Sequence, residues 1–231
     1  MLNKIIKNYS HFLIGVDTLD RVRAYLILNT EYKCLEKCKC FSSREELWDY
    51  SLQKIQNIPI CYVEYGVHQG YSIRYFLRQN KNQESIFIGL DSFEGLPEDW
   101  CDLPKGTFNE SGRIPKVDDD RVNFVKGWFQ DTEKILFAKV DFSKPLNLIV
   151  HFDADLYSST LFALAKMDVF GKPYTAIFDE FTTHECRALY DYCKSHTATV
   201  DFLGKTLSNN YPNQVLCKIN PRSKQVTMKV T

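Results

Sequence analysis

The segment Ile60-Cys-Tyr-Val-Glu-Tyr-Gly-Val-His-Gln-Gly70 decides the fold, because it joins an apolar run to a glycine turn. Glu64, Gly66 and Gly70 form an E-x-G-x-x-x-G pattern, and a helical pattern begins near Ser72. Glycines between a strand and a helix let the backbone approach a ligand closely. The same glycines would also make an ordinary strand-to-helix turn. The pattern therefore indicates an α/β protein and is compatible with a ligand site at the turn.

Short β-rich runs continue outward from this segment and alternate with helical patterns. They lie at residues 60–64, 86–91, 122–126, 148–153 and 174–179. Strands that alternate with helices predict a parallel sheet with helices on both faces. Two last runs, at 198–203 and 214–219, are joined by about ten residues without a helix, which predicts an antiparallel hairpin. The predicted fold is a Rossmann-like α/β fold with a seven-stranded, mostly parallel sheet.

Two segments depart from this alternation. Residues 1–58 are rich in helix formers, with Leu19, Val22 and Leu26 at helical spacing, and they predict a helical N-terminal cap before a main domain at residues 59–231. Residues 96–120 contain several prolines and glycines and no periodic pattern. Loops of this length inside a compact domain usually form functional lids or are disordered.

Charge and hydropathy limit the kinds of partner. The chain has 231 residues, with 29 Lys plus Arg against 29 Asp plus Glu. No net field draws it to nucleic acid or to an anionic membrane surface, so we expect a small-molecule partner. The N-terminus lacks a continuous apolar signal region, and no run approaches the roughly 20 apolar residues that span a bilayer. We therefore expect a protein without membrane insertion.

Cysteine usage points to a reducing compartment. Among the eight cysteines, Cys61 and Cys217 lie in apolar segments, where a thiol acts as a small hydrophobic group. Cys34, Cys38 and Cys40 are clustered, but no matching Cys or His pair follows at zinc-finger distance. Free thiols and a cytoplasmic location are the expectation.

Acidic residues at the ends of the predicted strands are the candidate functional groups, since ligands of open α/β sheets bind outside the carboxyl ends of the strands. Asp91 follows Glu64 by 27 residues, where doubly wound folds place a carboxylate that accepts hydrogen bonds from a ribose. In the alternative, Asp91 and Ser92 only shape a turn. We expect Asp91 to bind a ribose and Gly127 to face the same crevice.

Four carboxylates follow two strands that we expect to be neighbours: Asp153, Asp155, Asp179 and Glu180. Their combined charge is costly unless some take up protons or a cation neutralises them, and oxygen ligands suit magnesium or calcium. Asp153, Asp179 and Glu180 are the predicted metal ligands, although all four would also serve as helix caps. His184 is a candidate general base or acceptor contact, with packing as its alternative role.

These residues lie in motifs that together resemble the macrocin O-methyltransferase family. The motifs are Glu64-Tyr-Gly-Val-His-Gln-Gly70, Gly89-Leu-Asp-Ser-Phe-Glu-Gly-Leu-Pro97, Gly127-Trp-Phe-Gln-Asp-Thr132, Phe152-Asp-Ala-Asp-Leu-Tyr-Ser-Ser-Thr160 and Phe178-Asp-Glu-Phe181. They follow one another in unbroken order between Ile60 and His196. The N-terminal segment and the last hairpin match only in outline.

The resemblance implies a class I methyltransferase that moves a methyl group from S-adenosylmethionine to a hydroxyl with the help of Mg²⁺, typically on a sugar of a natural product or polysaccharide. It also suggests a homodimer or larger assembly. By position, it places Glu64, Gly66 and Gly70 near the methionine part of the cofactor and Ser72 at the cofactor. It places Asp91 and Ser92 at the ribose and Gly127 and Trp128 at the adenine. Asp153 lies at cofactor and metal, and Asp179 and Glu180 lie at the metal.

Asp153 is the first candidate for the base that takes the hydroxyl proton, followed by Asp155 or His184. The family usually has D-G-D and D-D where this chain has Asp153-Ala-Asp155 and Asp179-Glu180, so the third ligand is one methylene longer. Two other functions remain. An NAD-dependent sugar oxidoreductase would use a G-x-G-x-x-G turn, which is absent from the sequence, and a methyltransferase-like domain without catalysis would serve as a binding module.

Overall fold

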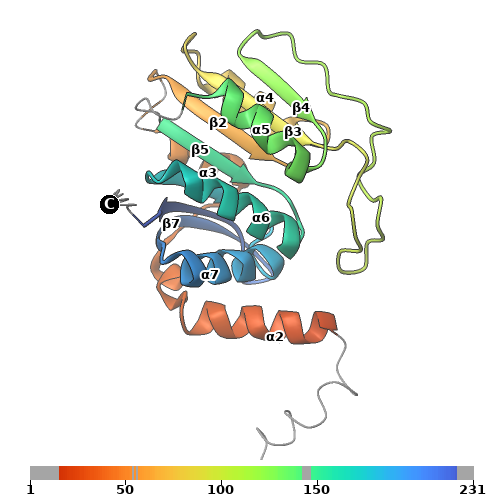
Figure 1. The fold of residues 1–231 in the computed structure, drawn as a ribbon. Helices are drawn as coiled ribbons and strands as arrows, with labels where there is room; N and C mark the ends of the chain where they lie inside the picture. Colours follow the sequence, from red (N-terminus) through yellow and green to blue (C-terminus); the bar gives the residue numbers. More distant parts are fainter. Residues whose placement is uncertain (1–15, 54, 56, 142–146, 223–231) are drawn as a thin grey trace, which may run out of the picture.

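One eight-stranded sheet organises the protein, in the order β1-β7-β8-β6-β5-β2-β3-β4 (Figure 1). The structure is a computed structural model that describes residues 16–53, 55, 57–141 and 147–222. The strands are β1 (Lys39–Cys40), β2 (Ile60–Tyr65), β3 (Ile86–Asp91), β4 (Val122–Lys126), β5 (Asn147–Phe152), β6 (Tyr174–Phe178), β7 (Thr199–Ser208) and β8 (Tyr211–Asn220). The α-helices are α2 (Val16–Asn29), α3 (Arg44–Leu52), α4 (Tyr71–Gln79), α5 (Phe129–Lys139), α6 (Tyr157–Met167) and α7 (His184–His196). Two 3-10 turns lie at Lys33–Lys37 and Asp168–Phe170.

The centre of the sheet is parallel, as predicted. β2 pairs with β3 on one side and with β5 on the other, and β4 and β6 extend these pairs in the same direction. The chain therefore runs outward from β2 to β4 and then returns to start again at β5. This reversal leaves a crevice between β2 and β5 at the carboxyl ends of the strands, where ligands of doubly wound folds bind.

The predicted hairpin is confirmed, and it is longer than expected. β8 is antiparallel to both β6 and β7, and the two-residue turn between β7 and β8 is Asn209-Asn210. Both asparagines have positive φ, 50° and 67°, which is the backbone of the two-residue hairpin turns that match strand twist. Asparagine tolerates this conformation better than most residues, so the turn chemistry explains where the hairpin folds back.

The sheet has one strand more than the seven predicted. β1 pairs in parallel with β7 at the edge of the sheet, with Lys39 opposite Gly204. It comprises two exposed residues, so the sequence contains no alternation that would reveal it. Residues 39–40 of the predicted helical cap are therefore part of the sheet. The part of that cap before residue 16 lies outside the described residues.

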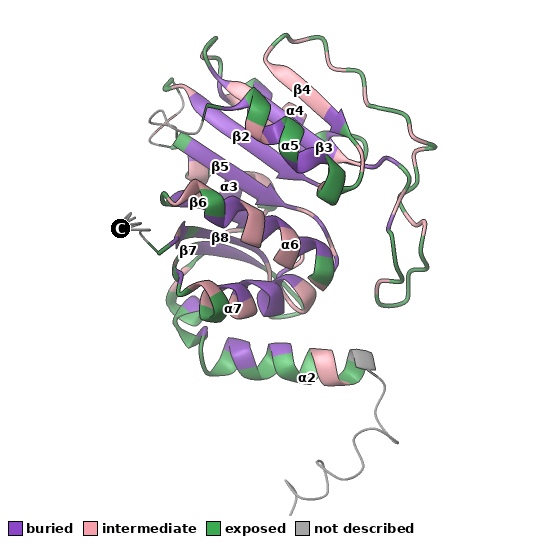
Figure 2. Cartoon of the chain, viewed as in Figure 1, coloured by how far each residue is buried: buried purple, intermediate pink, exposed green. Residues whose placement is uncertain are grey.

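Helices cover both faces of the sheet (Figures 1 and 2). On one face, α2, α5, α6 and α7 contribute to a core cluster that includes Ile27, Leu136, Leu164 and Leu189. On the other face, α3 and α4 contribute Trp48 and Phe76 to a second cluster, together with strand residues. β2 is buried along its whole length because it lies between these two layers.

α3 brings the N-terminal segment onto the carboxyl edge of the sheet. Ser43 caps the helix by accepting a hydrogen bond from the Glu46 amide, and the Glu46 carboxylate accepts from the Ser42 amide and hydroxyl. Leu47 and Trp48, on the inner face of α3, are fully buried. The cap fixes where α3 begins, so the side chain of Arg44 in its first turn lies at the cavity described below.

Candidate active site

A cavity of about 780 Å³ lies at the carboxyl edge of the sheet. Turns after β2, β3, β4, β5 and β6 line it, together with α3 and the loop that follows β3. Nine residues predicted for the site line this cavity: Gly66, Asp91, Ser92, Gly127, Trp128, Asp153, Asp155, Asp179 and Glu180. Four others do not line it: Glu64, Gly70, Ser72 and His184. The strand ends thus bring together the residues that the sequence placed at one edge.

Gly66 joins the turn after β2 to the turn after β5. Its φ is +91°, and a Cβ at this position would lie 1.8 Å from the main-chain oxygen of Asp153. Only glycine permits this contact, because any side chain would collide with the backbone. Gly70, with φ +74°, forms the N-cap of α4 and closes the turn by donating its N–H to the Val67 oxygen. Both glycines therefore shape the cavity through the backbone.

Asp91 organises the turns around the cavity. Its Oδ2 accepts hydrogen bonds from the amides of Val67 and His68, both at 2.8 Å, and its Oδ1 accepts from the amide of Phe93 at 2.7 Å. Ser92 accepts from the amide of Glu94. Asp91 and Ser92 therefore do shape the turn, which is the alternative role that the sequence left open for them. Oδ1 accepts this one hydrogen bond and so keeps a second lone pair. Because Asp91 lines the cavity, that lone pair can accept from a ligand hydroxyl.

Glu64 and Ser72 form a buried support beneath the turn. The Glu64 carboxylate is fully buried, and its Oε1 accepts from the Ser72 hydroxyl. The hydroxyl of Tyr62 lies 3.1 Å from the same Oε1. Glu64 Oε2 has no hydrogen-bond partner in the described part of the chain. These side chains therefore connect β2 to the start of α4 from below.

Carboxylates crowd the wall formed after β5 and β6. Burial and the nearby Asp179 and Asp155 carboxylates raise the pKa of Asp153 well above its usual range. Burial, Asp179 and Glu180 raise the pKa of Asp155 to about 7. Burial and Asp179 also raise the pKa of Glu180. In each case burial is the largest cause, followed by the like charge of a neighbour. Negative charge on this wall is therefore costly, and the carboxyl groups tend to hold protons where no cation neutralises them.

The chemistry of these donors suits a hard divalent cation. Magnesium and calcium bind carboxylate oxygens, and a cation would relieve the repulsion that raises the pKa values. Within residues 16–53, 55, 57–141 and 147–222, no three His, Cys, Asp or Glu side chains are grouped tightly enough to hold a metal ion as they stand. Asp153, Asp179 and Glu180 line the same cavity. Their side chains would have to move closer together to bind a cation.

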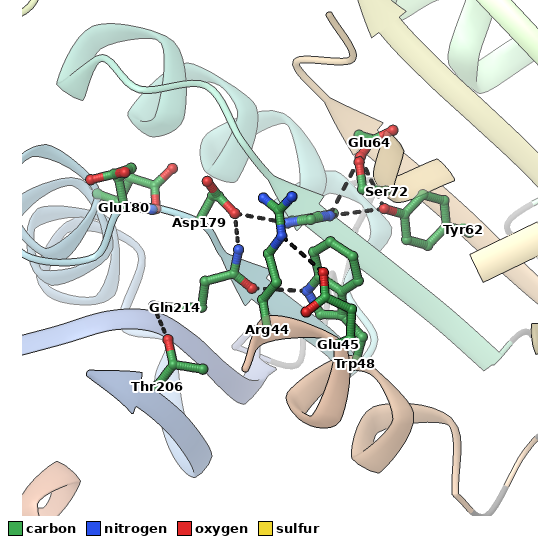
Figure 3. Close-up of polar contacts among 12 residues, drawn as sticks. Arg44, Glu45, Trp48, Tyr62, Glu64, Ser72, Asp179, Glu180, Thr206 and Gln214 are labelled. Atoms are coloured by element: carbon green, nitrogen blue, oxygen red, sulfur yellow. Dashed lines mark hydrogen bonds and ion pairs between the residues drawn. The ribbon is translucent and has the colours of Figure 1, made fainter. Parts of the chain in front are cut away.

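Two buried side chains that the sequence did not single out fix Asp179 and Glu180. Glu185, in the first turn of α7, accepts the amide of Glu180 at 3.0 Å, and its burial raises its pKa well above the usual range. Gln214 of β8 donates its side-chain amide to Asp179 Oδ1 (Figure 3). The sequence did not identify Glu185 because a glutamate is common in the first turn of a helix. It did not identify Gln214 because a single glutamine within a strand forms no recognisable motif.

Trp48 determines which way the Gln214 amide points. The indole Nε1 of Trp48 lies 2.9 Å from Gln214 Oε1, and an indole N–H only donates. The oxygen of Gln214 therefore faces Trp48 and the nitrogen faces Asp179 (Figure 3). Thr206 of β7 holds the Gln214 backbone by accepting its amide. Residues from α3, β6, β7 and β8 thus meet behind the carboxylate wall.

His151 of β5 occupies the centre of this network. Its ring is fully buried, with Nδ1 2.8 Å from the Tyr62 hydroxyl and Nε2 3.9 Å from Asp179 Oδ1. Nε2 has no hydrogen-bond partner among the described residues. Burial and the Glu64 carboxylate raise the pKa of Tyr62 well above its usual range, so this phenol keeps its proton. An ionisable side chain inside an apolar strand, two residues before Asp153, is the signal that was available in the sequence.

The loop after β3, here called the lid, supplies part of the cavity lining. Trp100 and Phe108 of this loop line the cavity, and Arg113 does not. Glu98 accepts a hydrogen bond from the Ser158 hydroxyl of α6 at 2.7 Å. Cys101 Sγ lies 4.0 Å from His184 Nε2 at the start of α7. His184 therefore contacts the lid and lies outside the carboxylate wall.

Arg44 adds a positive charge to the cavity lining. Its guanidinium lies over the ring of Tyr71 at 4.7 Å and over that of Trp48 at 5.3 Å, and its Nε contacts Glu45 (Figure 3). Stacking on two aromatic faces fixes a planar guanidinium. The N-terminal segment therefore supplies a side chain to the cavity.

Comparison with known proteins identifies the family. The sequence profile described as macrocin-O-methyltransferase (TylF) matches residues 50–203, which span two thirds of the chain and the five strands β2 to β6. The chain therefore belongs to the macrocin O-methyltransferase family and is a class I, S-adenosylmethionine-dependent O-methyltransferase. None of the curated proteins matches it.

Solved structures share the fold at low sequence identity. An O-methyltransferase from Bacillus cereus in complex with SAH has a TM-score of 0.50 and 13% identity, covering 95% of this chain and 100% of that chain. A putative O-methyltransferase from Klebsiella pneumoniae has the same TM-score and identity, covering 95% of each chain. The O-methyltransferase TomG from Streptomyces achromogenes, in complex with SAM, has a TM-score of 0.49 and 11% identity, with 95% and 96% coverage. At this identity the first two show the Rossmann-like methyltransferase fold alone.

Proposed function

We propose that this protein methylates a hydroxyl of a sugar or of a glycosylated natural product or polysaccharide, using S-adenosylmethionine and a divalent cation. The observation that carries the proposal is that the glycine turn after β2 and the carboxylates after β5 and β6 line the same cavity. The turn and Asp91 suit a nucleoside cofactor. The carboxylate wall suits a cation that binds hydroxyl oxygens. Sugars supply vicinal hydroxyls for such a cation.

The cofactor lies, in this proposal, along the turns after β2, β3 and β4. Asp91 accepts a ribose hydroxyl with the lone pair left on Oδ1, Ser92 lies beside it, and the Gly127-Trp128 turn borders the adenine. Gly66 has no side chain, so the methionine part of the cofactor can lie close to the backbone of the turn. Glu64, Gly70 and Ser72 act here by holding the turn, because none of the three lines the cavity.

Asp153, Asp179 and Glu180 are the proposed cation ligands. A bound Mg²⁺ would neutralise the wall and lower the pKa of an acceptor hydroxyl. Gln214 and Glu185 contribute by holding Asp179 and the Glu180 backbone in place. The lid excludes water, and the fixed geometry brings the acceptor oxygen into line with the methyl group and the sulfur.

Asp153 is the proposed base, with Asp155 next. A base is effective when its pKa lies near the working pH, and the raised pKa values of both carboxyls move them in that direction. His184 ranks last because it contacts Cys101 of the lid and does not line the cavity.

Calorimetric titration with S-adenosylhomocysteine tests the cofactor. We expect micromolar binding that NAD does not compete with, and absence of binding would contradict the proposal. A screen of glycosides with radiolabelled S-adenosylmethionine then tests catalysis. Asp153→Ala and Asp179→Ala should each lower methyl transfer at least 100-fold, since removal of a carboxylate from such a site costs several kcal/mol of transition-state stabilisation, on the order of 3.

The same experiments separate the alternatives. A binding module without catalysis would bind S-adenosylhomocysteine and transfer no methyl group to any glycoside. An NAD-dependent oxidoreductase would bind NAD instead. A sugar oxidoreductase of this kind would also use a catalytic Tyr-x-x-x-Lys pair. The sequence has this spacing at Tyr50 and at Tyr190, and neither tyrosine lines the cavity, so the structure offers no observation in favour of that alternative.

A further inference from the structure

The cavity is lined by more acidic than basic side chains. Its described lining contains three basic residues: Arg44, His68 and Lys105. His68 Nε2 lies 2.9 Å from the Glu110 carboxylate, and Lys105 belongs to the lid. The acidic residues of the lining are Asp91, Glu98, Asp153, Asp155, Asp179 and Glu180. An anionic group of a ligand is repelled by most of this lining, so its binding depends on one of the few cations.

Arg44 is the basic residue that lies beside the glycine turn after β2. Its guanidinium lies 4.7 Å from the ring centroid of Tyr71, and Tyr71 directly follows Gly70 at the start of α4. Arg44 itself belongs to the first turn of α3. The N-terminal segment therefore places a positive charge near the turn along which the methionine part of the cofactor is proposed to lie.

The backbone donors of this turn are already used. Among the residues that line the cavity there, Gly66 donates its amide to the Leu90 oxygen at 3.0 Å. Val67 and His68 both donate their amides to Asp91 Oδ2 at 2.8 Å. A carboxylate that approaches these three residues finds no free backbone N–H, so it needs a side-chain donor.

The guanidinium of Arg44 is held in place with its terminal nitrogens available. Its Nε donates to Glu45 Oε1 at 3.2 Å, and the Tyr71 hydroxyl donates to the same oxygen at 2.9 Å (Figure 3). The rings of Tyr71 and the buried Trp48 lie against the guanidinium. Within the described part of the chain, Nη1 and Nη2 donate to no residue, and the side chain is 45% exposed. These two nitrogens can donate in parallel to both oxygens of one carboxylate.

We propose that Arg44 binds the carboxylate of the cofactor's methionine part, donating to it from Nη1 and Nη2. The inference rests on the proposed placement of the cofactor, with its methionine part at the turn after β2. The carboxylate is the anionic group of S-adenosylmethionine, which carries no phosphate. Because the two rings and Glu45 orient the guanidinium beforehand, binding costs little side-chain freedom. Arg44 lies before residues 50–203, which match the family profile, so α3 adds its own residue to the cofactor site.

Two ligands that differ only in the carboxylate test this contact. S-adenosylhomocysteine carries the carboxylate, whereas decarboxylated S-adenosylhomocysteine keeps the adenosine, the thioether and the amine. Calorimetric titration measures the affinity of each ligand for wild type and for Arg44→Met, which keeps an unbranched apolar side chain against the rings. We expect Arg44→Met to bind S-adenosylhomocysteine roughly 10- to 100-fold more weakly, and the decarboxylated ligand to change by about threefold or less. Arg44→Lys keeps the charge without the paired donors and should lie between wild type and Arg44→Met.

Arg78→Met is the matched control. Arg78 of α4 also lies over an aromatic ring, that of Tyr75 at 5.8 Å, and it does not line the cavity. The substitution removes the same charge and the same kind of stacking at another exposed position, and both affinities should stay at the wild-type values. Urea unfolding of each variant shows that the fold is retained.

Unchanged affinity of Arg44→Met for S-adenosylhomocysteine would overturn the inference and leave the cofactor assignment intact. Equal losses for the two ligands would also overturn it, because they would show that Arg44 shapes the cavity without contacting the carboxylate. If wild type binds neither ligand, the proposed cofactor site is wrong, and the role of Arg44 is wrong with it.

Discussion

At the scale of single residues, the difference between Asp91 and His151 shows what the sequence reveals. Asp91, Asp153 and Asp179 were predicted to lie together because each ends a strand of a parallel sheet, and the carboxyl ends of such strands share one edge. The partners that hold them were not predicted. Gln214 lies 35 residues from Asp179 and His151 lies 89 residues from Tyr62, so only the folded chain brings them into contact.

Asp91→Asn should disrupt the turns around the cavity. Asparagine replaces one acceptor oxygen with a donor, so either the Val67 and His68 amides or the Phe93 amide loses its partner. Hydrogen bonds to charged groups are worth about 1.5–3 kcal/mol, so the free energy of unfolding should fall by about 2 kcal/mol. Affinity for S-adenosylhomocysteine should fall roughly tenfold or more. Urea unfolding and calorimetry measure the two effects. Asp118→Asn, at an exposed loop position, should change neither.

The crowded carboxyls predict a stability that falls as the pH rises. Asp155 has a folded-state pKa of about 7 against an ordinary value of 3.8, so the folded state holds a proton that the unfolded chain has released. Between these values the unfolded chain binds fewer protons, and the free energy of unfolding decreases with rising pH. Urea titrations from about pH 5 to about pH 8 should show this decrease, and Asp155→Asn should reduce it. Added Mg²⁺ should restore stability most at the highest pH. A flat profile in wild type would contradict the account.

At the scale of elements, the prediction was accurate where patterns are long and failed where they are short. The five strands β2 to β6 were placed within a residue or so, because β-rich runs alternate with amphipathic helices such as α4. β1 was missed because two exposed residues carry no pattern. The lid was recognised as a long loop, but its contacts with α6 and α7 depend on side chains that no periodicity describes.

Ser158→Ala should loosen the lid without unfolding the protein. The hydroxyl of Ser158 donates to Glu98 of the lid, and this contact lies at an exposed position. We expect S-adenosylhomocysteine to dissociate a few times faster, because a surface hydrogen bond contributes about 0.5–1.5 kcal/mol, while the midpoint of urea unfolding stays nearly unchanged. Stopped-flow displacement measures the rate. Ser195→Ala, at the far end of α7, is the control, and an identical rate in both variants would count against a closed lid.

At the scale of the whole molecule, the N-terminal segment is packed into both layers. α2 contributes Ile27 and Leu28 to one core cluster, and α3 contributes Leu47, Trp48 and Leu52 to the other. No described helix is long and apolar enough to cross a membrane. The division into a cap at residues 1–58 and a domain at 59–231 remains a prediction, and the shared clusters make it testable.

A chain that begins at residue 59 should not fold cooperatively. This shorter chain lacks α3, so the face of the sheet that Leu47, Trp48 and Leu52 cover would be exposed. Burial of each such side chain contributes roughly 1.5–3 kcal/mol to the free energy of unfolding. The expected result is a broad urea transition with strong binding of a hydrophobic dye. A chain that begins at Val16 keeps every described contact and should unfold as sharply as the full chain. Sharp unfolding of the shorter chain would establish an independent domain.

The hydrogen bond between Trp48 and Gln214 also constrains the order in which the site is completed during synthesis. The two residues are 166 positions apart, and α3 emerges long before β8. A nascent chain that already contains the glycine turn and both carboxylate strands has not yet made Gln214, the residue that holds Asp179. The contact also has one of the largest sequence separations among the described hydrogen bonds, so forming it requires closure of a long loop of chain. A ribosome-bound chain arrested before β8 therefore carries all the proposed cation ligands without the polar framework that orients them.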